Sequence, residues 1–92
     1  MQTNRSKDLI DVEEKKMRLV ISEQVKHLRM ANGETQADLA ELIGIPRQYV
    51  VYIEGGTRRN VPVFMIFRMA RHWGVPMELI CSGQTSDIEK MN

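Results

Sequence analysis

Apolar residues recur at helical spacing in two short segments that flank Gly44, between residues 35 and 54. In the first segment, Thr35 and Asp38 stand three residues apart, as in a capping box at a helix start. The stripe that this helix would bury consists of Leu39, Ala40 and Ile43. Glycine enters the left-handed conformation of a helix end at little steric cost, so Gly44 predicts a sharp turn. The pattern predicts two helices joined at Gly44, a helix-turn-helix.

The second segment begins at Pro46, which suits a first helical position because its missing N–H would have no partner there. At 3.6 residues per turn, the residues that follow divide into two faces. The inward face holds Tyr49, Val50 and Ile53, and the outward face holds Arg47, Gln48, Val51 and Tyr52. Arginine can pair with guanine, glutamine with adenine, and valine can touch the thymine methyl. We therefore expect the outward face to contact base edges in the major groove of DNA.

Three further helices complete an all-α architecture of five helices. One runs through Val25 to about Ala31, another from Pro62 to Trp73, and a short last one spans residues 76–80. The core face expected for the helix that begins at Pro62 holds Val63, Ile66, Phe67, Ala70 and Trp73. Apolar residues left over after a small core is filled usually mark an interface. We assign four of them to a two-fold dimer contact: Phe64, Met65, Met77 and Ile80.

The chain divides into an N-terminal extension, a helix-turn-helix domain and a flexible tail, expected at residues 1–18, 19–81 and 82–92. In the extension, Asp11 can cap a helix because Glu14 stands three residues further on, so we expect it to be partly helical. Its charges alternate in sign as on solvated helix faces, which favours packing against the domain or a partner subunit. A DNA-contacting arm that uses Arg5 and Lys7 stays open as the alternative.

Five pieces of the chain, between residues 21 and 80, resemble the Cro/C1-type (XRE) family of bacterial and phage helix-turn-helix regulators. They are VKHLR, TQADLAELIGI, RQYVVYIE, RN and MARHWGV. The resemblance implies a lambda-repressor-like fold of five helices, to which this chain adds an N-terminal helical segment. The Arg-x-Tyr start of the second motif helix and the later Arg-Asn pair also resemble the controller proteins of restriction-modification systems. The chain departs from the family pattern at Pro46, Val51 and Tyr52.

The resemblance also implies roles for single residues. Gln36 would bond a DNA phosphate and brace the second motif helix, and Ala40 would let the two motif helices approach closely. Arg29 and Glu54 match an ion pair that ties the first helix to the second motif helix, and an unpaired buried charge at Arg29 would be costly. The other expected contacts to the DNA backbone are Thr35, Tyr49, Arg58, Arg59 and Asn60.

Charge is unevenly distributed, although the net charge is only +1. Residues 46–73 carry +4, because five arginines there stand against Glu54, and such a basic stretch suits DNA phosphates. The single cysteine, Cys81, excludes an internal disulfide and a Cys-rich zinc site. We expect no metal and no cofactor, and a reducing cytoplasm. No apolar run nears the ~20 residues of a membrane span, and no signal-peptide pattern opens the chain.

Three functions compete for this sequence. Catalysis is disfavoured because only His27, His72 and Cys81 offer reactive groups, at no spacing typical of a site. A protein-binding helix-turn-helix module, such as an antitoxin whose main partner is a protein, stays the alternative. Arg47 and Gln48 favour DNA binding, and a chain this small gains stability from self-association. We expect a transcriptional regulator that binds double-stranded DNA as a homodimer on an inverted repeat, with half-sites ~34 to 36 Å apart, and a second protein partner stays open.

Overall fold

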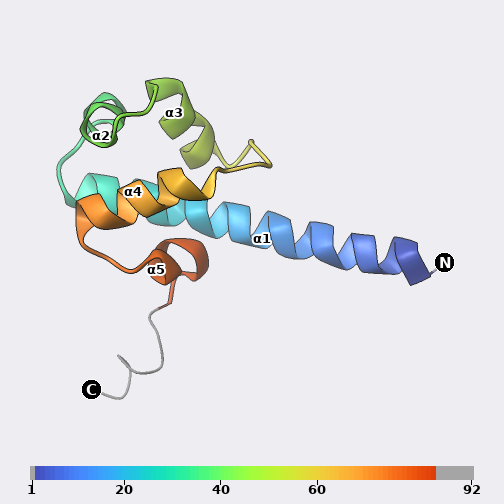
Figure 1. Cartoon of the computed structure of the whole chain (residues 1–92). Helices are drawn as coiled ribbons and strands as arrows, with labels where there is room; N and C mark the ends of the chain where they lie inside the picture. The colour runs from blue at the N-terminus through green and yellow to red at the C-terminus, as the bar shows by residue number, and fades with distance from the viewer. Residues whose placement is uncertain (1, 85–92) are drawn as a thin grey trace, which may run out of the picture.

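A computed structural model describes residues 2–84, with side chains from Lys7 onward, and these residues form five helices and no strand (Figure 1). The helices are α1 (Gln2–Ala31), α2 (Gln36–Ile43), α3 (Arg47–Gly55), α4 (Val63–Trp73) and α5 (Met77–Ser82). The predicted all-α class with five helices is confirmed. The expected tail lies outside the described residues from residue 85 onward, and so does the side chain of Arg5.

Helix α1 is continuous over 30 residues, so the expected boundary between residues 18 and 19 falls inside it. No glycine or proline interrupts the sequence before Asn32, and a helix of this length spans roughly 45 Å. The expectation that Asp11 caps a helix is therefore wrong, because Asp11 lies well inside α1. Its carboxylate accepts a hydrogen bond from Arg59 at 3.1 Å instead. The first half of α1 extends beyond the other helices (Figure 1).

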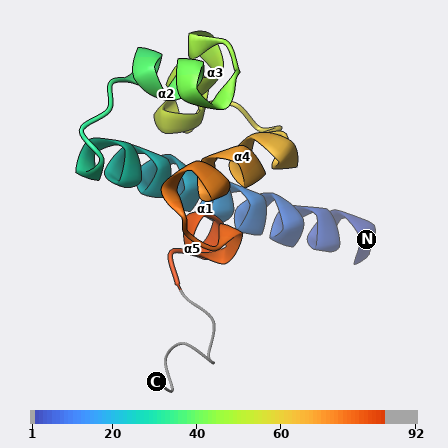
Figure 2. The ribbon, with the colours of Figure 1, turned by 60° about the vertical axis from the view of Figure 1, so that its left-hand side comes forward.

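The remaining helices gather around the second half of α1. Helices α2 and α3 lie on one side of α1, and α5 lies on the other (Figures 1 and 2). All five helices contribute side chains to one core, whose largest fully buried members are Leu39, Met69, Ile80, Val25 and Val50. The end of α3 comes close to α1, since a Cβ added to Gly56 would lie 3.3 Å from Leu19 Cδ2. This core fixes the position of α3, which carries the expected base-contacting face.

Helix α4 buries a different stripe from the one expected. Its buried residues are Met65, Ile66, Met69 and Ala70. Val63 and Phe67, which we expected in the core, are exposed, and Trp73 is half-buried. Apolar side chains occupy seven of the eight positions from 63 to 70, so helical periodicity alone is compatible with both stripes. Packing against α2 and α5 selects the observed one.

Candidate nucleic-acid interface

Helix α2 begins with a complete capping box. The backbone N–H of Asp38 donates to Thr35 Oγ1 at 3.0 Å, and the backbone N–H of Thr35 donates to Asp38 Oδ2 at 2.9 Å. The hydrogen bond from the Thr35 backbone, helped by the Thr35 side chain, lowers the pKa of Asp38. The two reciprocal bonds satisfy N–H groups that a helix start would otherwise leave unpaired. The Thr35 side chain, which we expected at the DNA backbone, serves as the helix cap.

The turn between α2 and α3 depends on Gly44, which has φ 72° and ψ 41°. The turn is closed by hydrogen bonds from the backbone N–H groups of Gly44 to Glu41 O, at 3.3 Å, and of Ile45 to Ala40 O, at 3.0 Å. Ile45 then enters the core. Pro46 has extended backbone angles and occupies the N-cap position of α3 without a side-chain hydrogen bond, so the first helical residue is Arg47, and not Pro46 as we expected.

Helix α3 separates an inward face from an outward face. Val50 and Ile53 are buried, and Tyr49 is half-buried against the same core. On the other side, Arg47, Gln48 and Val51 are exposed and Tyr52 is half-buried. The Gln48 side-chain amide donates to the Tyr52 hydroxyl one turn along the helix. The four residues expected at base edges therefore share one accessible face, and two of them are linked to each other.

A largely buried ion pair fixes α3 to α1. Arg29 Nε donates to Glu54 Oε2 at 2.6 Å and Arg29 Nη2 donates to Glu54 Oε1 at 3.0 Å, while the two side chains are only 13% and 5% exposed. The hydrogen bond with Glu54 raises the pKa of Arg29. Gln36 Nε2 donates to the same carboxylate at 3.2 Å, and the Ser22 hydroxyl donates to the Glu54 backbone carbonyl. Glu54 thus joins α1, α2 and α3, and Gln36 braces α3 from inside the protein.

The loop after α3 contacts the helix through Arg58. The guanidinium of Arg58 lies 4.7 Å from the centre of the Tyr49 ring and 5.7 Å from that of Tyr52, both on α3. A cation over an aromatic face is attracted by the ring quadrupole, so Arg58 holds the loop against the outward edge of α3. Arg59 instead pairs with Asp11 of α1 at 3.1 Å, and Asn60 is exposed.

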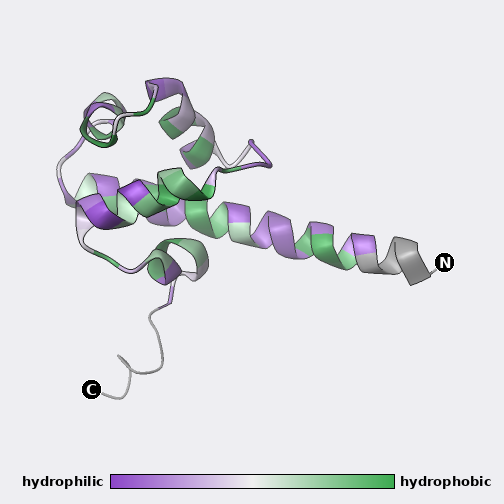
Figure 3. Cartoon of the chain, viewed as in Figure 1, coloured by the Kyte–Doolittle hydropathy of each residue, from purple (hydrophilic) through white to green (hydrophobic). Residues whose placement is uncertain are grey.

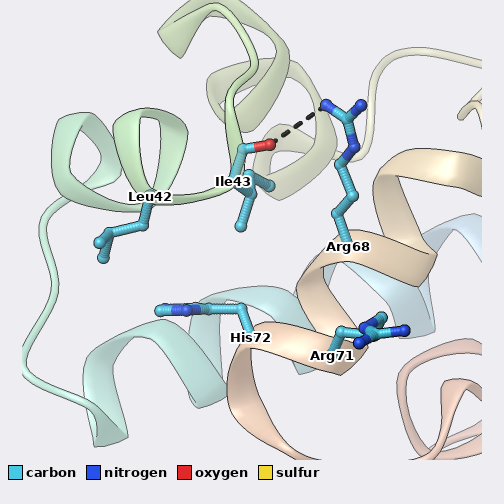
Figure 4. A pocket seen from close by; sticks show the side chains of 5 residues that line it. All are labelled: Leu42, Ile43, Arg68, Arg71 and His72. Atoms are coloured by element: carbon cyan, nitrogen blue, oxygen red, sulfur yellow. Dashed lines mark hydrogen bonds between the residues drawn. The ribbon is translucent and has the colours of Figure 1, made fainter.

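Arg68 of α4 stabilises the turn between α2 and α3, a role that the sequence did not indicate. Its Nη1 donates to the carbonyl of Ile43 at 3.2 Å (Figure 4). The same Nη1 donates to the carbonyl of Gly44, the residue that ends α2, at 3.4 Å. The last carbonyls of a helix have no partner within it, and a cation there complements the helix dipole. The bond spans 25 residues of sequence, so no local pattern could have revealed it.

Glu34, in the loop between α1 and α2, is a second residue that the sequence did not single out. Its carboxylate accepts a hydrogen bond from Trp73 Nε1 at 2.9 Å and contacts His72 Nε2. Its backbone carbonyl accepts from Arg29 Nη1 at 2.6 Å. His72, which we expected on the surface, is therefore joined to this loop. These bonds connect the C-terminal end of α1 to the C-terminal end of α4.

Two of the four residues assigned to a dimer contact are core residues in this chain. Met65 and Ile80 are buried, because the stripe of α4 that packs inward includes Met65 and because α5 places Ile80 against α1. Met77 is half-buried, and Phe64 is exposed beneath the guanidinium of Arg68. Met65 and Ile80 cannot form a docking surface without unpacking the domain, so assigning them to the dimer contact was wrong.

Two short helices joined by a left-handed glycine, with a polar face on the second, define a helix-turn-helix domain. The helix-turn-helix family model matches residues 25–80, and the chain belongs to this family, of the Cro/C1 (XRE) type. The predicted family resemblance is confirmed, and the protein is a DNA-binding regulator of this type. No curated protein matches the chain. Across residues 2–84, no helix is long and apolar enough to cross a membrane.

Two solved structures are similar to this fold. The restriction-modification controller protein C.AhdI from Aeromonas hydrophila is 30% identical, with a TM-score of 0.63, over 68% of this chain and 94% of that one. A hypothetical transcription factor, NHTF from Neisseria, is 26% identical, with a TM-score of 0.68, over 85% of each chain. The likeness to C.AhdI leaves a third of this chain uncovered, whereas NHTF matches more of it.

Proposed function

We propose that this protein binds an inverted-repeat operator as a homodimer and places the outward face of α3 from each copy in successive major grooves. The observation that carries the proposal is the division of α3: Val50 and Ile53 are buried, while Arg47, Gln48 and Val51 stay accessible. A helix presented in this way fits the major groove, which is wide enough to admit it. Regulation of transcription then follows from occupancy of the operator.

Within this proposal, Arg47 and Gln48 read bases and Val51 contacts a thymine methyl. Tyr52 orients Gln48, because the Gln48 amide donates to its hydroxyl and leaves the amide oxygen free to accept a bond from a base. Arg58 contacts the DNA backbone at the edge of the same face, where it lies over Tyr49 and Tyr52. Contacts to phosphates set the register of the protein on the duplex and carry no sequence information.

The other expected backbone contacts contribute unequally. Asn60 is exposed, two residues after Arg58 in the sequence, and is proposed to reach a phosphate. Gln36 and Thr35 serve mainly through the contacts that they make inside the protein, with Glu54 and Asp38. Arg59 pairs with Asp11, but both side chains are substantially exposed. Such a pair is worth at most about 1 kcal/mol, so a phosphate can displace it.

Selection of bound duplexes from a random DNA library tests the proposal. The purified chain should enrich an inverted repeat whose half-sites lie about 10 bp apart from centre to centre. The Arg47→Ala/Gln48→Ala variant, which keeps every core residue, is the matched control and should not enrich the same half-site. Enrichment of a single half-site would contradict the homodimer. Enrichment of nothing at low salt would contradict DNA recognition itself.

A further inference from the structure

The first half of α1 forms an arm, residues 7–19, that runs past the other helices (Figure 1) and meets the loop after α3 on one side, through the pair of Asp11 with Arg59. Four of its apolar side chains, Leu9, Ile10, Val12 and Met17, are between 51% and 66% exposed. Hydrophobic bands along this half of the helix are visible in Figure 3. Leu19, where the arm meets the domain, is also exposed. The arm therefore presents an apolar surface that the rest of the described chain leaves largely uncovered.

The polar residues within this surface are arranged in a specific order. At 100° per residue, Leu9, Glu13 and Lys16 lie along the centre of the apolar surface, with Ile10 and Met17 on one edge and Val12 and Leu19 on the other. Glu13 and Lys16 are exposed, and among the described residues neither forms an ion pair. The centre of the surface thus holds one acidic and one basic side chain, three residues apart.

This order selects one direction of pairing with an identical helix. In a parallel pair, Glu13 would face Glu13 and Lys16 would face Lys16, and like charges in contact repel. In an antiparallel pair whose two-fold axis passes between Glu14 and Lys15, Glu13 of each copy faces Lys16 of the other. The same alignment brings Ile10 beside Met17 on one edge and Val12 beside Leu19 on the other. Both charges and apolar side chains are then complementary.

We propose that the arm pairs antiparallel with the arm of a second copy of this chain and so provides the subunit contact of the homodimer. The inference rests on the proposed homodimer and names its surface. Two identical antiparallel helices are related by a two-fold axis, which is the symmetry that an inverted-repeat operator requires. Pairing removes the apolar surface of the arm from solvent, which favours association.

Charge exchange on the full-length chain tests the pairing by sedimentation equilibrium. Glu13→Lys alone makes four basic groups meet at the centre of the pair, and Lys16→Glu alone makes four acidic groups meet. Each single change should raise the dimer dissociation constant about tenfold, equal to about 1.4 kcal/mol. The double variant Glu13→Lys/Lys16→Glu restores opposite charges and should dimerise as the unaltered chain does. Glu13 and Lys16 are both exposed, so the variants should keep the fold, and thermal unfolding checks this.

The outcomes separate the arm from the dimer itself. Single changes that weaken the dimer and a double change that restores it support the pairing. If the unaltered chain is dimeric and none of the variants alters its dissociation constant, the arm is not the contact and the homodimer stands. Loss of dimerisation in Phe64→Ser, on the exposed face of α4, would then identify the contact there. A chain that stays monomeric throughout overturns both proposals, and variants that weaken DNA binding without changing dimerisation assign the arm to DNA.

Discussion

The ion pair between Arg29 and Glu54 gives the sharpest prediction about stability. Glu54→Gln keeps the shape of the side chain but removes its charge, and leaves the Arg29 guanidinium, only 13% exposed, without its ion-pair partner. Breaking a buried pair by removing one partner costs about 3 to 5 kcal/mol. Arg29 keeps its hydrogen bond to the Glu34 carbonyl, so we expect the lower end, about 3 kcal/mol. That is a large share of the roughly 5 to 15 kcal/mol by which small domains are stable.

Urea unfolding followed by circular dichroism, at one fixed protein concentration, measures this loss. Glu41→Gln is the matched control, because Glu41 is an exposed glutamate of α2 and surface changes cost within about 0.5 kcal/mol. The double variant Arg29→Met/Glu54→Leu should recover most of the loss, since apolar replacement of a whole buried pair is often neutral. A cost below about 1 kcal/mol for Glu54→Gln would refute the reasoning. The reasoning would also be refuted if the separate costs of Arg29→Met and Glu54→Leu summed, within about 0.5 kcal/mol, to the cost of the double variant.

Three further predictions concern the DNA-facing residues and the helix ends. Arg47→Ala should cost about 1 to 3 kcal/mol of DNA-binding free energy and relax specificity at one base pair. Arg58→Ala should instead weaken binding to all duplexes alike and flatten the salt dependence of affinity. Mobility shifts on operator variants at two salt concentrations measure both effects, and identical behaviour of the two variants would contradict the separation of base contact from phosphate contact. Asp38→Asn should destabilise the fold at neutral pH. The pKa of Asp38 is lowered in the folded state, so its contribution to stability is present above the unfolded pKa of about 4 and is lost as pH falls through the folded pKa. If the unfolding curves of the unaltered chain and of Asp38→Asn stayed equally far apart down to about pH 2, the Asp38 carboxylate would not stabilise the helix start. Arg68→Met should cost about 1 kcal/mol in urea unfolding, by removing its bonds to the end of α2, and no measurable loss would show that the turn does not need this support.

The sequence determined the helix-turn-helix unit because its signals are local. The capping box joins residues three apart, Gly44 acts on its own backbone angles, and the two faces of α3 follow from 3.6 residues per turn. The family resemblance placed the Arg29–Glu54 pair at the correct positions although 25 residues separate the partners. The sequence pattern and the family resemblance together predicted the fold class, the ion pair that fixes α3 to α1, and the outward face of α3.

Only the tertiary structure decided which apolar side chains form the core and which stay on the surface. Helix α4 is apolar on nearly every side. Packing against the neighbouring helices, and not helical periodicity, therefore determines that Met65 is buried and Phe67 is exposed. The contacts of Arg68 with Ile43, of Trp73 with Glu34 and of Arg59 with Asp11 join residues 25, 39 and 48 positions apart.

The length of α1 and the direction of its arm were also beyond the reach of the sequence. An uninterrupted run of helix-compatible residues does not indicate which part of the helix the other helices will pack against. The packed domain covers the second half of α1 and leaves the apolar side chains of the first half exposed. Local chemistry therefore specified the helix-turn-helix unit, while burial, which depends on every other helix at once, decided which surfaces remain to be recognised.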